Sequence, residues 1–518
     1  MNEPLIIGAR GSALARIQAM QVGAALQTQD PKLQVKYLFS ASPADLPYGG
    51  DATSPTQDVF ESNVGRIIGG GGFTSHLQGQ LDDRTIDLAV HSWKDLPLVE
   101  RATTLVAATL PRADIRDVIL FRASVPDELR RGQFEYQPLR VLSCSARRRV
   151  NLGPFLRWAL PGPVQSVTFV PVRGDIERRL TTLVAGNAHA LVIAKAALDR
   201  LLQAPRPTFA ATSLHIRSLL DQCQIMIVPI AASPAAPGQG ALAIEARRDR
   251  HAIAARLVDI NDARDFKLVQ TERLRLARLG DDETPVGIST IALAFGDVEF
   301  VRGESNGVPI ERTTLTRIGK PLPRPAHADQ VWSGERDGAD PFTRIAMPLP
   351  VGTLAVGTGL LVARADALPL EHGVADDQLV WTAGLTTWRK LATRGVWVTG
   401  SDESLGETAA LSVRHMFPHI GRWIKLSHWD GFDSPHAQRL ATYSLRRARI
   451  PAPVHNFTHF FWRSGSQFRE YLRHYPGLEN AWHGCGPGNT LAQLRTMLAP
   501  PLLQPFLSGA QFRAELAA

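Results

Sequence analysis

Short apolar runs that end in polar turns recur along the chain, a pattern typical of buried strands in α/β proteins. The clearest run, residues 86–90, leads into the polar cluster His-Ser-Trp-Lys-Asp at 91–95, and Pro97 prevents the strand from continuing. Ligands of open α/β folds lie at the carboxyl ends of strands. Lys94 and Asp95 are therefore candidates for binding an anion and transferring a proton, although a surface ion pair in a turn explains the same two residues.

The same pattern predicts the regular elements around this cluster. Apolar runs predict strands at 5–8, 104–108, 118–121, 139–142, 167–172 and 188–194. Periodicity predicts helices at 13–26, 75–81 and 265–279, with Ser12 as the cap of the first helix. Four strand ends carry arginine, namely Arg10, Arg147 with Arg148, Arg173 with Arg179, and Arg200. Singly each is more often a solvated charge, but together they predict a cleft for a polyanionic ligand.

The middle of the chain predicts less regular structure. Residues 234–245 form a turn that leads into an alternating strand, and residues 303–343 are rich in Pro, Gly and polar side chains. We expect the latter to form a long insertion or a loose hairpin. Gly69–Gly72 lacks the Gly-Lys-Ser/Thr ending of a phosphate-binding loop. We therefore expect a mobile active-site segment there.

The C-terminal part contains a faint internal repeat after a linker at 369–380. Residues 381–391 and 482–494 share an order of strand, glycine turn, threonine and leucine. Thr387 and Thr490 are predicted to cap the two helices. Two such units predict a two-lobed α/β domain.

Composition narrows the function. The 518 residues suggest three or four domains, and 44% apolar with 20% charged residues is ordinary for a globular protein. The net charge of +8 is compatible with nucleic-acid binding, but zinc-finger spacing, a lysine-rich tail and an RNA-binding aromatic signature are missing. Arginines placed singly at strand ends suit small molecules that carry carboxylates. We expect no nucleic-acid partner.

Cysteine usage and hydropathy indicate the cellular compartment in which we expect the protein. The three cysteines are far apart, which excludes a disulfide framework and a cysteine zinc site and fits a reducing cytoplasm. No signal peptide is visible, and the longest apolar stretch, near 345–362, is broken by Pro and Gly. We expect a cytoplasmic protein with no membrane partner and no metal.

Six ordered motifs carry a family resemblance over about residues 5–290. They are residues 7–15 (Ile-Gly-Ala-Arg-Gly-Ser-Ala-Leu-Ala), 87–97 (Asp-Leu-Ala-Val-His-Ser-Trp-Lys-Asp-Leu-Pro), 143–148 (Ser-Cys-Ser-Ala-Arg-Arg), 172–180 (Val-Arg-Gly-Asp-Ile-Glu-Arg-Arg-Leu), 194–201 (Ala-Lys-Ala-Ala-Leu-Asp-Arg-Leu) and 237–245 (Pro-Gly-Gln-Gly-Ala-Leu-Ala-Ile-Glu). In order and spacing this part resembles porphobilinogen deaminase, also called hydroxymethylbilane synthase.

The resemblance implies an α/β fold with two periplasmic-binding-protein-like lobes and a small α+β third domain. It implies condensation of four porphobilinogen molecules into hydroxymethylbilane with release of ammonia, by a deaminase half that is monomeric. Asp95 matches the catalytic carboxylate, which helps to protonate the leaving amine and stabilises the cationic azafulvene. Each pyrrole carries an acetate and a propionate, and the implied substrate-binding residues are Arg10, Ser12, Lys94, Ser143, Ser145, Arg147, Arg148, Arg173, Arg179 and Arg200.

The chain departs from the family at its cofactor. The resemblance implies a dipyrromethane joined by a thioether to a loop cysteine, but Asp282 occupies that position here. A carboxylate forms at best a labile ester. The lysine of the flexible family segment is also missing between Gly69 and His76. Cys144 is a speculative substitute anchor, and the alternative is a small packing residue.

The part from about 375 to 518 resembles uroporphyrinogen-III synthase more weakly, and a generic two-lobed α/β domain explains it nearly as well. Only Thr387 and Thr490 are carried over. That family closes hydroxymethylbilane into a ring, so its substrate is the deaminase product. The expected division is lobe 1 at 1–110 with a return near 205–230, lobe 2 at 111–204 with 231–262, a third domain at 263–368, and the synthase-like domain at 375–518.

Three functions remain open from the sequence. The first is an active tetrapyrrole-biosynthetic enzyme, with cyclisation as an additional activity. The second is a relative that lacks the cofactor and binds porphobilinogen or a linear tetrapyrrole without polymerising it. The third is a transferase that makes a different pyrrole product.

Overall fold

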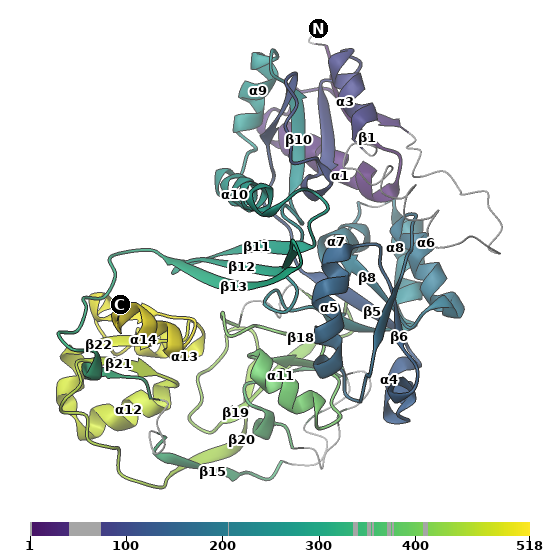
Figure 1. Cartoon of the computed structure of the whole chain (residues 1–518). Helices are drawn as coiled ribbons and strands as arrows, with labels where there is room; N and C mark the ends of the chain where they lie inside the picture. The colour runs from purple at the N-terminus through teal and green to yellow at the C-terminus, as the bar shows by residue number, and fades with distance from the viewer. Residues whose placement is uncertain are drawn as a thin grey trace. The chain divides into compact units, whose positions relative to one another are not determined.

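The computed structural model describes residues 3–40, 74–205, 207–334, 340–349, 354, 357–369, 374, 378–407 and 413–517. The described residues form two compact units (Figure 1). Unit 1 is drawn from Met1–Arg157, Pro163–Thr290 and Phe300–Arg312, and unit 2 from Trp158–Gly162, Ile291–Glu299 and Thr313–Ala518. Residues of the predicted third domain fall in both units.

The first sheet of unit 1 has five strands in the order β2-β1-β3-β10-β4. The strands in that order are Val35–Ser40, Leu5–Arg10, Leu88–Ser92, Leu242–Arg247 and Thr104–Ala108. Helices α1 (Ala13–Gln29), α3 (Ser75–Asp82) and α9 (His251–Val258) pack against it. Ser12 caps α1 by accepting a hydrogen bond from the Ala15 amide, so the predicted helices and cap are confirmed.

The second sheet of unit 1 also has five strands, in the order β7-β6-β8-β5-β9. They are Val167–Val170, Leu139–Leu142, Ala190–Ala194, Asp117–Arg122 and Cys223–Ile227. Helices α4 (Val125–Arg130), α5 (Ala146–Ala159), α6 (Ile176–Thr182), α7 (Lys195–Leu202) and α8 (Ala210–Leu220) follow its strands or connect them. The predicted strands of this part are confirmed, with ends that differ by one or two residues.

The two sheets share one topology. In each, the fourth strand runs antiparallel to both neighbours, β10 to β3 and β4 and β5 to β8 and β9. The chain leaves one sheet for the other twice, between β4 and β5 and between β9 and β10. This arrangement agrees with the predicted pair of α/β lobes, and the mixed α/β class is confirmed.

The predicted return segments are wrong in their assignment. The strand within 205–230, β9, pairs with β5 of the second sheet, whereas β10, within 231–262, joins the first sheet. Apolar periodicity identifies a strand but contains no information about the sheet that it joins. The predicted alternation along β10 is also wrong: Leu242–Ala246 is buried throughout, because this strand lies between β3 and β4 with both faces covered.

A three-stranded sheet follows the helix α10 (Ala263–Leu279). Its order is β11-β12-β13, with bounds Val286–Leu293, Gly296–Ser305 and Val308–Arg317. The predicted loose hairpin therefore begins as a regular one, since β12 and β13 are joined at Asn306 and Gly307. The next elements are η5 (Ala328–Gln330) and β14 (Val331–Trp332).

The rest of unit 2 contains two sheets, as expected for a two-lobed α/β domain. The larger has the order β15-β20-β19-β16-β17-β18, with bounds Phe342–Ala346, Gln438–Arg447, Arg422–His428, Thr358–Val362, Leu379–Thr382 and Gly400–Ser401. The smaller has the order β14-β21-β22-β23, the last three being His459–Trp462, Trp482–Cys485 and Leu503–Pro505. The helices are α11 (Leu385–Ala392), α12 (Gly465–His474), α13 (Asn489–Leu494) and α14 (Gly509–Ala517).

Among the described residues, helices of the length and apolarity needed to cross a membrane do not occur, and neither do clusters of three potential metal ligands from His, Cys, Asp or Glu. The predicted mobile segment Gly69–Gly72 lies outside the described residues, as does most of the predicted linker at 369–380.

Candidate active site

The predicted polar cluster lies where β3 ends. The chain there makes a single 3₁₀ turn, η2 (Trp93–Asp95). Trp93 is buried against Phe266, with ring centroids 5.0 Å apart, so the indole anchors the turn in the apolar core. The turn leaves Asp95 exposed and Lys94 partly buried. A carboxylate and an ammonium are thus presented side by side at the carboxyl end of a buried strand.

Lys94 is fixed by a buried glutamine. Its Nζ donates to Oε1 of Gln239 at 3.1 Å, and Nε2 of Gln239 donates to Oδ1 of Asp117 at 3.0 Å. Gln239 reaches this position because the following residue, Gly240, has a φ of +89°. A Cβ at Gly240 would lie 2.5 Å from the Ala113 carbonyl oxygen, so the close approach of the two backbones requires glycine.

Two of the predicted substrate-binding arginines are bound to Asp117. Nη2 of Arg147 and Nη2 of Arg148 donate to its two carboxylate oxygens at 2.8 and 2.7 Å, and all three side chains are almost completely buried. Arg147 also donates to the Pro234 carbonyl at 2.6 Å, and Arg148 to that of Val192 at 3.2 Å. The pair therefore leaves one net positive charge beside Lys94, and its direct contact with substrate stays a prediction.

Burial and these charges shift two pKa values in the network. The pKa of Lys94 is lowered to about 8, mainly by burial; Arg148 and Arg147 act in the same direction, and Asp95 and Asp117 oppose them. Burial alone would raise the pKa of Asp117, but Arg148 and Arg147 outweigh it and hold that pKa well below the usual range. Lys94 consequently keeps its charge at neutral pH but loses its proton at a lower pH than an ordinary lysine does.

The remaining predicted arginines differ in their surroundings. Burial lowers the pKa of Arg179 on α6, and the charges that act on this side chain include Arg148 and Asp95. Arg200 on α7 donates to the Gly240 carbonyl at 2.8 Å, which ties it to the turn that carries Gln239. Arg173 is exposed, and Arg10 lies partly buried at the end of β1.

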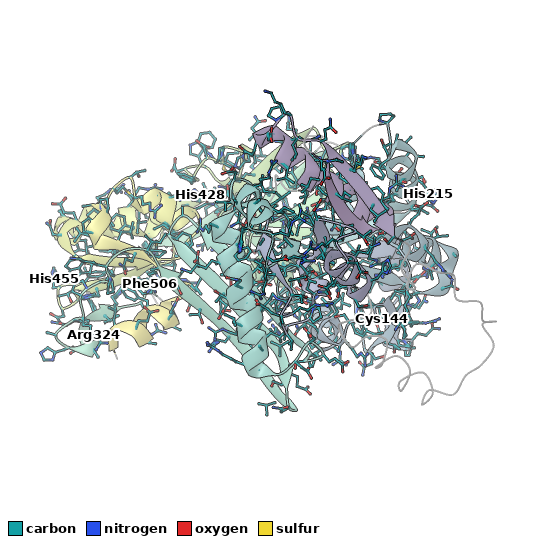
Figure 2. The ribbon with its side chains drawn as sticks, turned by 90° about the horizontal axis from the view of Figure 1, so that it is seen from above. Cys144, His215, Arg324, His428, His455 and Phe506 are labelled. Atoms are coloured by element: carbon teal, nitrogen blue, oxygen red, sulfur yellow. The ribbon has the colours of Figure 1, made fainter. Side chains whose placement is uncertain are left out.

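The predicted hydroxyl and thiol groups make local contacts. The hydroxyl oxygen of Ser143 accepts from the Ser145 amide at 3.3 Å, and that of Ser145 from the Arg148 amide at 3.3 Å. Cys144 (Figure 2) is exposed, and its sulfur exchanges two hydrogen bonds with the Val172 backbone at 3.1 and 3.3 Å. These contacts join the ends of β6 and β7 and place the three side chains on one turn.

The comparisons with known proteins cover the same part of the chain. The family model described as "Porphobilinogen deaminase, dipyromethane cofactor binding domain" matches residues 5–255. A porphobilinogen deaminase from Nocardia farcinica is 34% identical over 286 residues, which span 55% of this chain and 69% of that protein. One from Syntrophus aciditrophicus is 30% identical over 299 residues, or 57% of this chain and 83% of that protein. The chain belongs to the porphobilinogen deaminase family.

Solved structures add little to this assignment. A periplasmic sulfonate-binding protein from Methylobacillus flagellatus is 9% identical with a TM-score of 0.26, over 53% of this chain and 69% of that one. An arginine-transport periplasmic binding protein from Legionella pneumophila is 10% identical with a TM-score of 0.25, over 54% and 99%. Similarities at this level of identity and TM-score support no conclusion about this chain.

Membership of the deaminase family makes a dipyrromethane cofactor the expectation, but the residue at its attachment position does not fit. Both carboxylate oxygens of Asp282 lie 3.2 Å from the Leu98 amide, which donates to them. Arg273 on α10 donates to the carbonyl oxygens of Trp93 and Pro97, which joins this helix to the turn that carries Asp95. Position 282 therefore contacts the segment that follows Asp95, and it offers a carboxylate in place of a thiol.

Sequence reasoning missed the buried groups that hold this candidate site together. In the sequence, Gln239 stands out only as part of a turn motif, and Asp117 only as part of a charged stretch between two strands. Glu245 on β10 was also missed: it pairs with His91 Nε2 at 3.1 Å and accepts from Gln78 at 3.1 Å, which ties β10 to β3 and α3. A charged residue inside an apolar strand was the available signal, because such residues are buried only when paired.

Thr387 and Thr490 lie far along the chain from the deaminase motifs, and the predicted capping role is wrong. The N-cap residues are Gly384 and Gly488, and neither threonine makes a cap hydrogen bond. Each threonine hydroxyl instead donates at 3.4 Å to the carbonyl that follows a neighbouring strand, Ala363 after β16 and Arg463 after β21. The threonines come after the first helical residue, so their hydroxyls lie beyond the N-cap position.

Proposed function

We propose that this deaminase-family chain is a hydroxymethylbilane synthase-type transferase of tetrapyrrole biosynthesis. In each condensation the C–N bond of the porphobilinogen aminomethyl group breaks and ammonia leaves with an added proton. The methylene carbon then bonds to the free α-carbon of the next pyrrole, and that carbon loses its proton. Four porphobilinogen molecules and one water give hydroxymethylbilane and four ammonia molecules.

The observation that carries the proposal is the exposed Asp95 next to Lys94, whose ammonium donates a hydrogen bond to the buried Gln239. The Lys94–Gln239–Asp117 connection anchors the ammonium to two buried arginines. Lys94 and Arg179 then supply positive charge for the acetate and propionate groups. Asp95 is the one carboxylate of the turn, and it donates a proton to the leaving amine and stabilises the cationic pyrrole that remains.

The test is ammonia release from porphobilinogen by the whole chain. Asp95→Asn keeps the shape of the side chain but cannot transfer the proton, so we expect at least about a 100-fold loss of rate. Glu100→Gln is the matched control, because this exposed carboxylate follows the same turn and pairs with the exposed Arg248. Equal rates for Asp95→Asn and the native chain would refute the assignment.

We further propose that the native chain uses its primer without a thioether bond. The carboxylate of Asp282 supports this proposal, because it accepts from the Leu98 amide and is not a thiol nucleophile. Asp282→Cys restores the family's residue at a position beside Asp95. We expect purified D282C to carry a stable mass increment of a dipyrrole, and D282N to carry none. An increment on D282N would place the attachment elsewhere, and D282N/Cys144→Ala would then test Cys144.

The alternative is a cofactor-less relative that binds porphobilinogen or a linear tetrapyrrole without polymerising it. The replacement at position 282 favours this alternative, whereas Asp95 beside Lys94 favours catalysis. Binding of porphobilinogen with no ammonia release would support the alternative.

Cyclisation to uroporphyrinogen III by unit 2 is a separate proposal. It is supported by the repeated strand–glycine–helix arrangement, in which Gly384 and Gly488 both approach Ser404. The ring isomer formed from hydroxymethylbilane tests it: the type III isomer is expected, and the type I isomer alone would refute it.

A further inference from the structure

A charged side chain on α10 bridges the turn that carries Asp95. Arg273 donates from Nη1 to the Trp93 carbonyl at 3.3 Å and from Nη2 to the Pro97 carbonyl. One guanidinium therefore joins the residue at which the turn begins to a residue that follows it. Phe266 of the same helix packs against the Trp93 ring, and Figure 1 shows α10 beside the sheet that contains β1 and β10. The bridge consequently attaches the turn to a helix of 17 residues.

The two ends of this turn are held differently. At its entry the Trp93 amide donates to the Ala241 carbonyl at 3.0 Å, which continues the pairing of β3 with β10. At its exit Pro97 has no amide proton, so the pairing stops there. Beyond the buried side chain of Leu96, the exit depends on the polar contacts of the Pro97 carbonyl and the Leu98 amide.

The Leu98 amide is bound by the residue at the family's attachment position. Both carboxylate oxygens of Asp282 accept from it at 3.2 Å. The loop that carries Asp282 is itself ordered, because the Asp281 carboxylate accepts from the Glu283 amide at 3.0 Å. Burial lowers the pKa of Arg273, and the charge of Asp282 opposes this effect. A guanidinium and a carboxylate that act on each other therefore hold the same short segment of backbone.

The direction of the Asp95 side chain depends on this backbone. Its carboxylate is exposed and accepts no hydrogen bond from another of the described residues. A displacement of roughly 1 Å between reacting groups lowers the rate of a reaction by up to about 100-fold. Contacts that fix residues 93–98 therefore affect proton transfer by Asp95 without touching the substrate.

We propose that Arg273 and Asp282 are positioning residues that hold Asp95 in the orientation needed for proton transfer. Resting on the proposed function, this gives the carboxylate at position 282 a role of its own, namely to fix the exit of the turn. A cysteine sulfur there would be a weak acceptor and would lack the charge that acts on Arg273. The replacement at position 282 therefore exchanges a covalent attachment point for a hydrogen bond to the Leu98 amide.

Two substitutions of Asp282 test its role through ammonia release from porphobilinogen. Asp282→Ala removes the acceptor, so kcat should fall at least about 3-fold, while KM stays within about 2-fold because Lys94 keeps its contacts. Asp282→Asn keeps an oxygen for the Leu98 amide and should recover most of the lost rate. Glu283→Ala removes an exposed carboxylate of the same loop and is the matched control. Equal kcat in Asp282→Ala and Glu283→Ala would overturn the proposal, and so would an equal loss in Asp282→Ala and Asp282→Asn.

Arg273 is tested in the same assay. Arg273→Met removes both donors, and kcat should fall at least about 10-fold. Arg273→Lys keeps the charge without the planar fork and should recover only part of that loss. Arg278→Met changes an exposed arginine in the last turn of the same helix and should behave as the native chain does. Unchanged kcat in folded Arg273→Met would overturn the proposal, and if that variant does not fold, Asp282→Ala decides.

Hydrogen exchange of the backbone amides of residues 96–99 separates this proposal from the proposed function. Exchange followed by mass spectrometry should be several-fold faster in Asp282→Ala than in Glu283→Ala, because the Leu98 amide loses its acceptor. Faster exchange in Asp282→Ala, with no ammonia release by the native chain, would count against the proposed function only. Ammonia release by the native chain, with equal exchange and equal kcat in the two variants, would count against the positioning role only.

Discussion

At the scale of single residues, the site depends on a lysine whose proton is weakly held. Lys94 is partly buried beside two arginines that are already paired with Asp117, so an ammonium there is costly. A carboxylate of a bound substrate offsets this cost, because its negative charge stabilises the ammonium of Lys94. Lys94 should therefore matter most for capturing the substrate and less for the step that follows.

This argument predicts a pH dependence of KM. The pKa of Lys94 in the free protein is about 8, so its positive charge is present below that pH and lost as the pH rises through it. We expect KM for porphobilinogen to rise several-fold between pH 7.5 and 9, with a smaller change in kcat. Steady-state rates across that range provide the measurement. Lys94→Arg, which stays charged, should remove the rise; an identical rise in that variant would contradict the assignment.

The sequence predicted the candidate site residues better than it predicted the contacts that their side chains make. Lys94 and Asp95 were found because a polar pair after an apolar run is a local signal. The ion pairs of Arg147 and Arg148 with Asp117 could not be predicted, since 30 residues of sequence separate Asp117 from the nearer arginine, Arg147. Asp282 is a third case: its position followed from the motif order, whereas its contact with Leu98 depends on packing between distant loops.

At the scale of elements, the buried ion pair joins the sheet and helix of the second lobe. Asp117 begins β5, and Arg147 and Arg148 lie in the first turn of α5. Without the carboxylate, two guanidinium groups remain buried without a counter-charge, which costs about 3–5 kcal/mol in comparable sites.

We therefore expect Asp117→Asn to destabilise unit 1 by about 3 kcal/mol or more. The depressed pKa of Asp117 means that its stabilisation is present above the unfolded pKa of about 3.9 and is lost as the pH falls below that value. Urea unfolding at pH 7 and at pH 3 provides the measurement. Asp127→Asn in the exposed pair with Arg130 is the control and should shift stability by less than about 1 kcal/mol. Equal effects of the two variants would refute the role of the buried pair.

The elements themselves were largely predictable, because each depends on local pattern. The strands and helices of unit 1 follow the apolar runs, and Ser12 caps α1 as its side chain indicates. Sheet membership was not predictable, and β9 and β10 were assigned to the wrong lobes because pairing depends on where the crossovers run. One local signal was overlooked: Asn306-Gly307, with φ of +51° and +76°, is the two-residue turn that favours a tight hairpin.

At the scale of the whole molecule, the chain joins a deaminase-family unit to a second α/β unit. In the proposed assignment, Asp95 and its supporting network supply the family's catalytic carboxylate, and Asp282 stands in place of the family's anchor cysteine. We propose that this chain condenses porphobilinogen without a thioether-bound primer at that position.

Intact mass of the denatured native chain, before and after porphobilinogen, tests this claim most directly when ammonia release is followed in the same sample. We expect sustained ammonia release by a chain that stays at its sequence mass of 56.6 kDa, while D282C gains a dipyrrole. A native chain that releases no ammonia would refute this proposal. A native chain that carries a stable pyrrole adduct would contradict it equally.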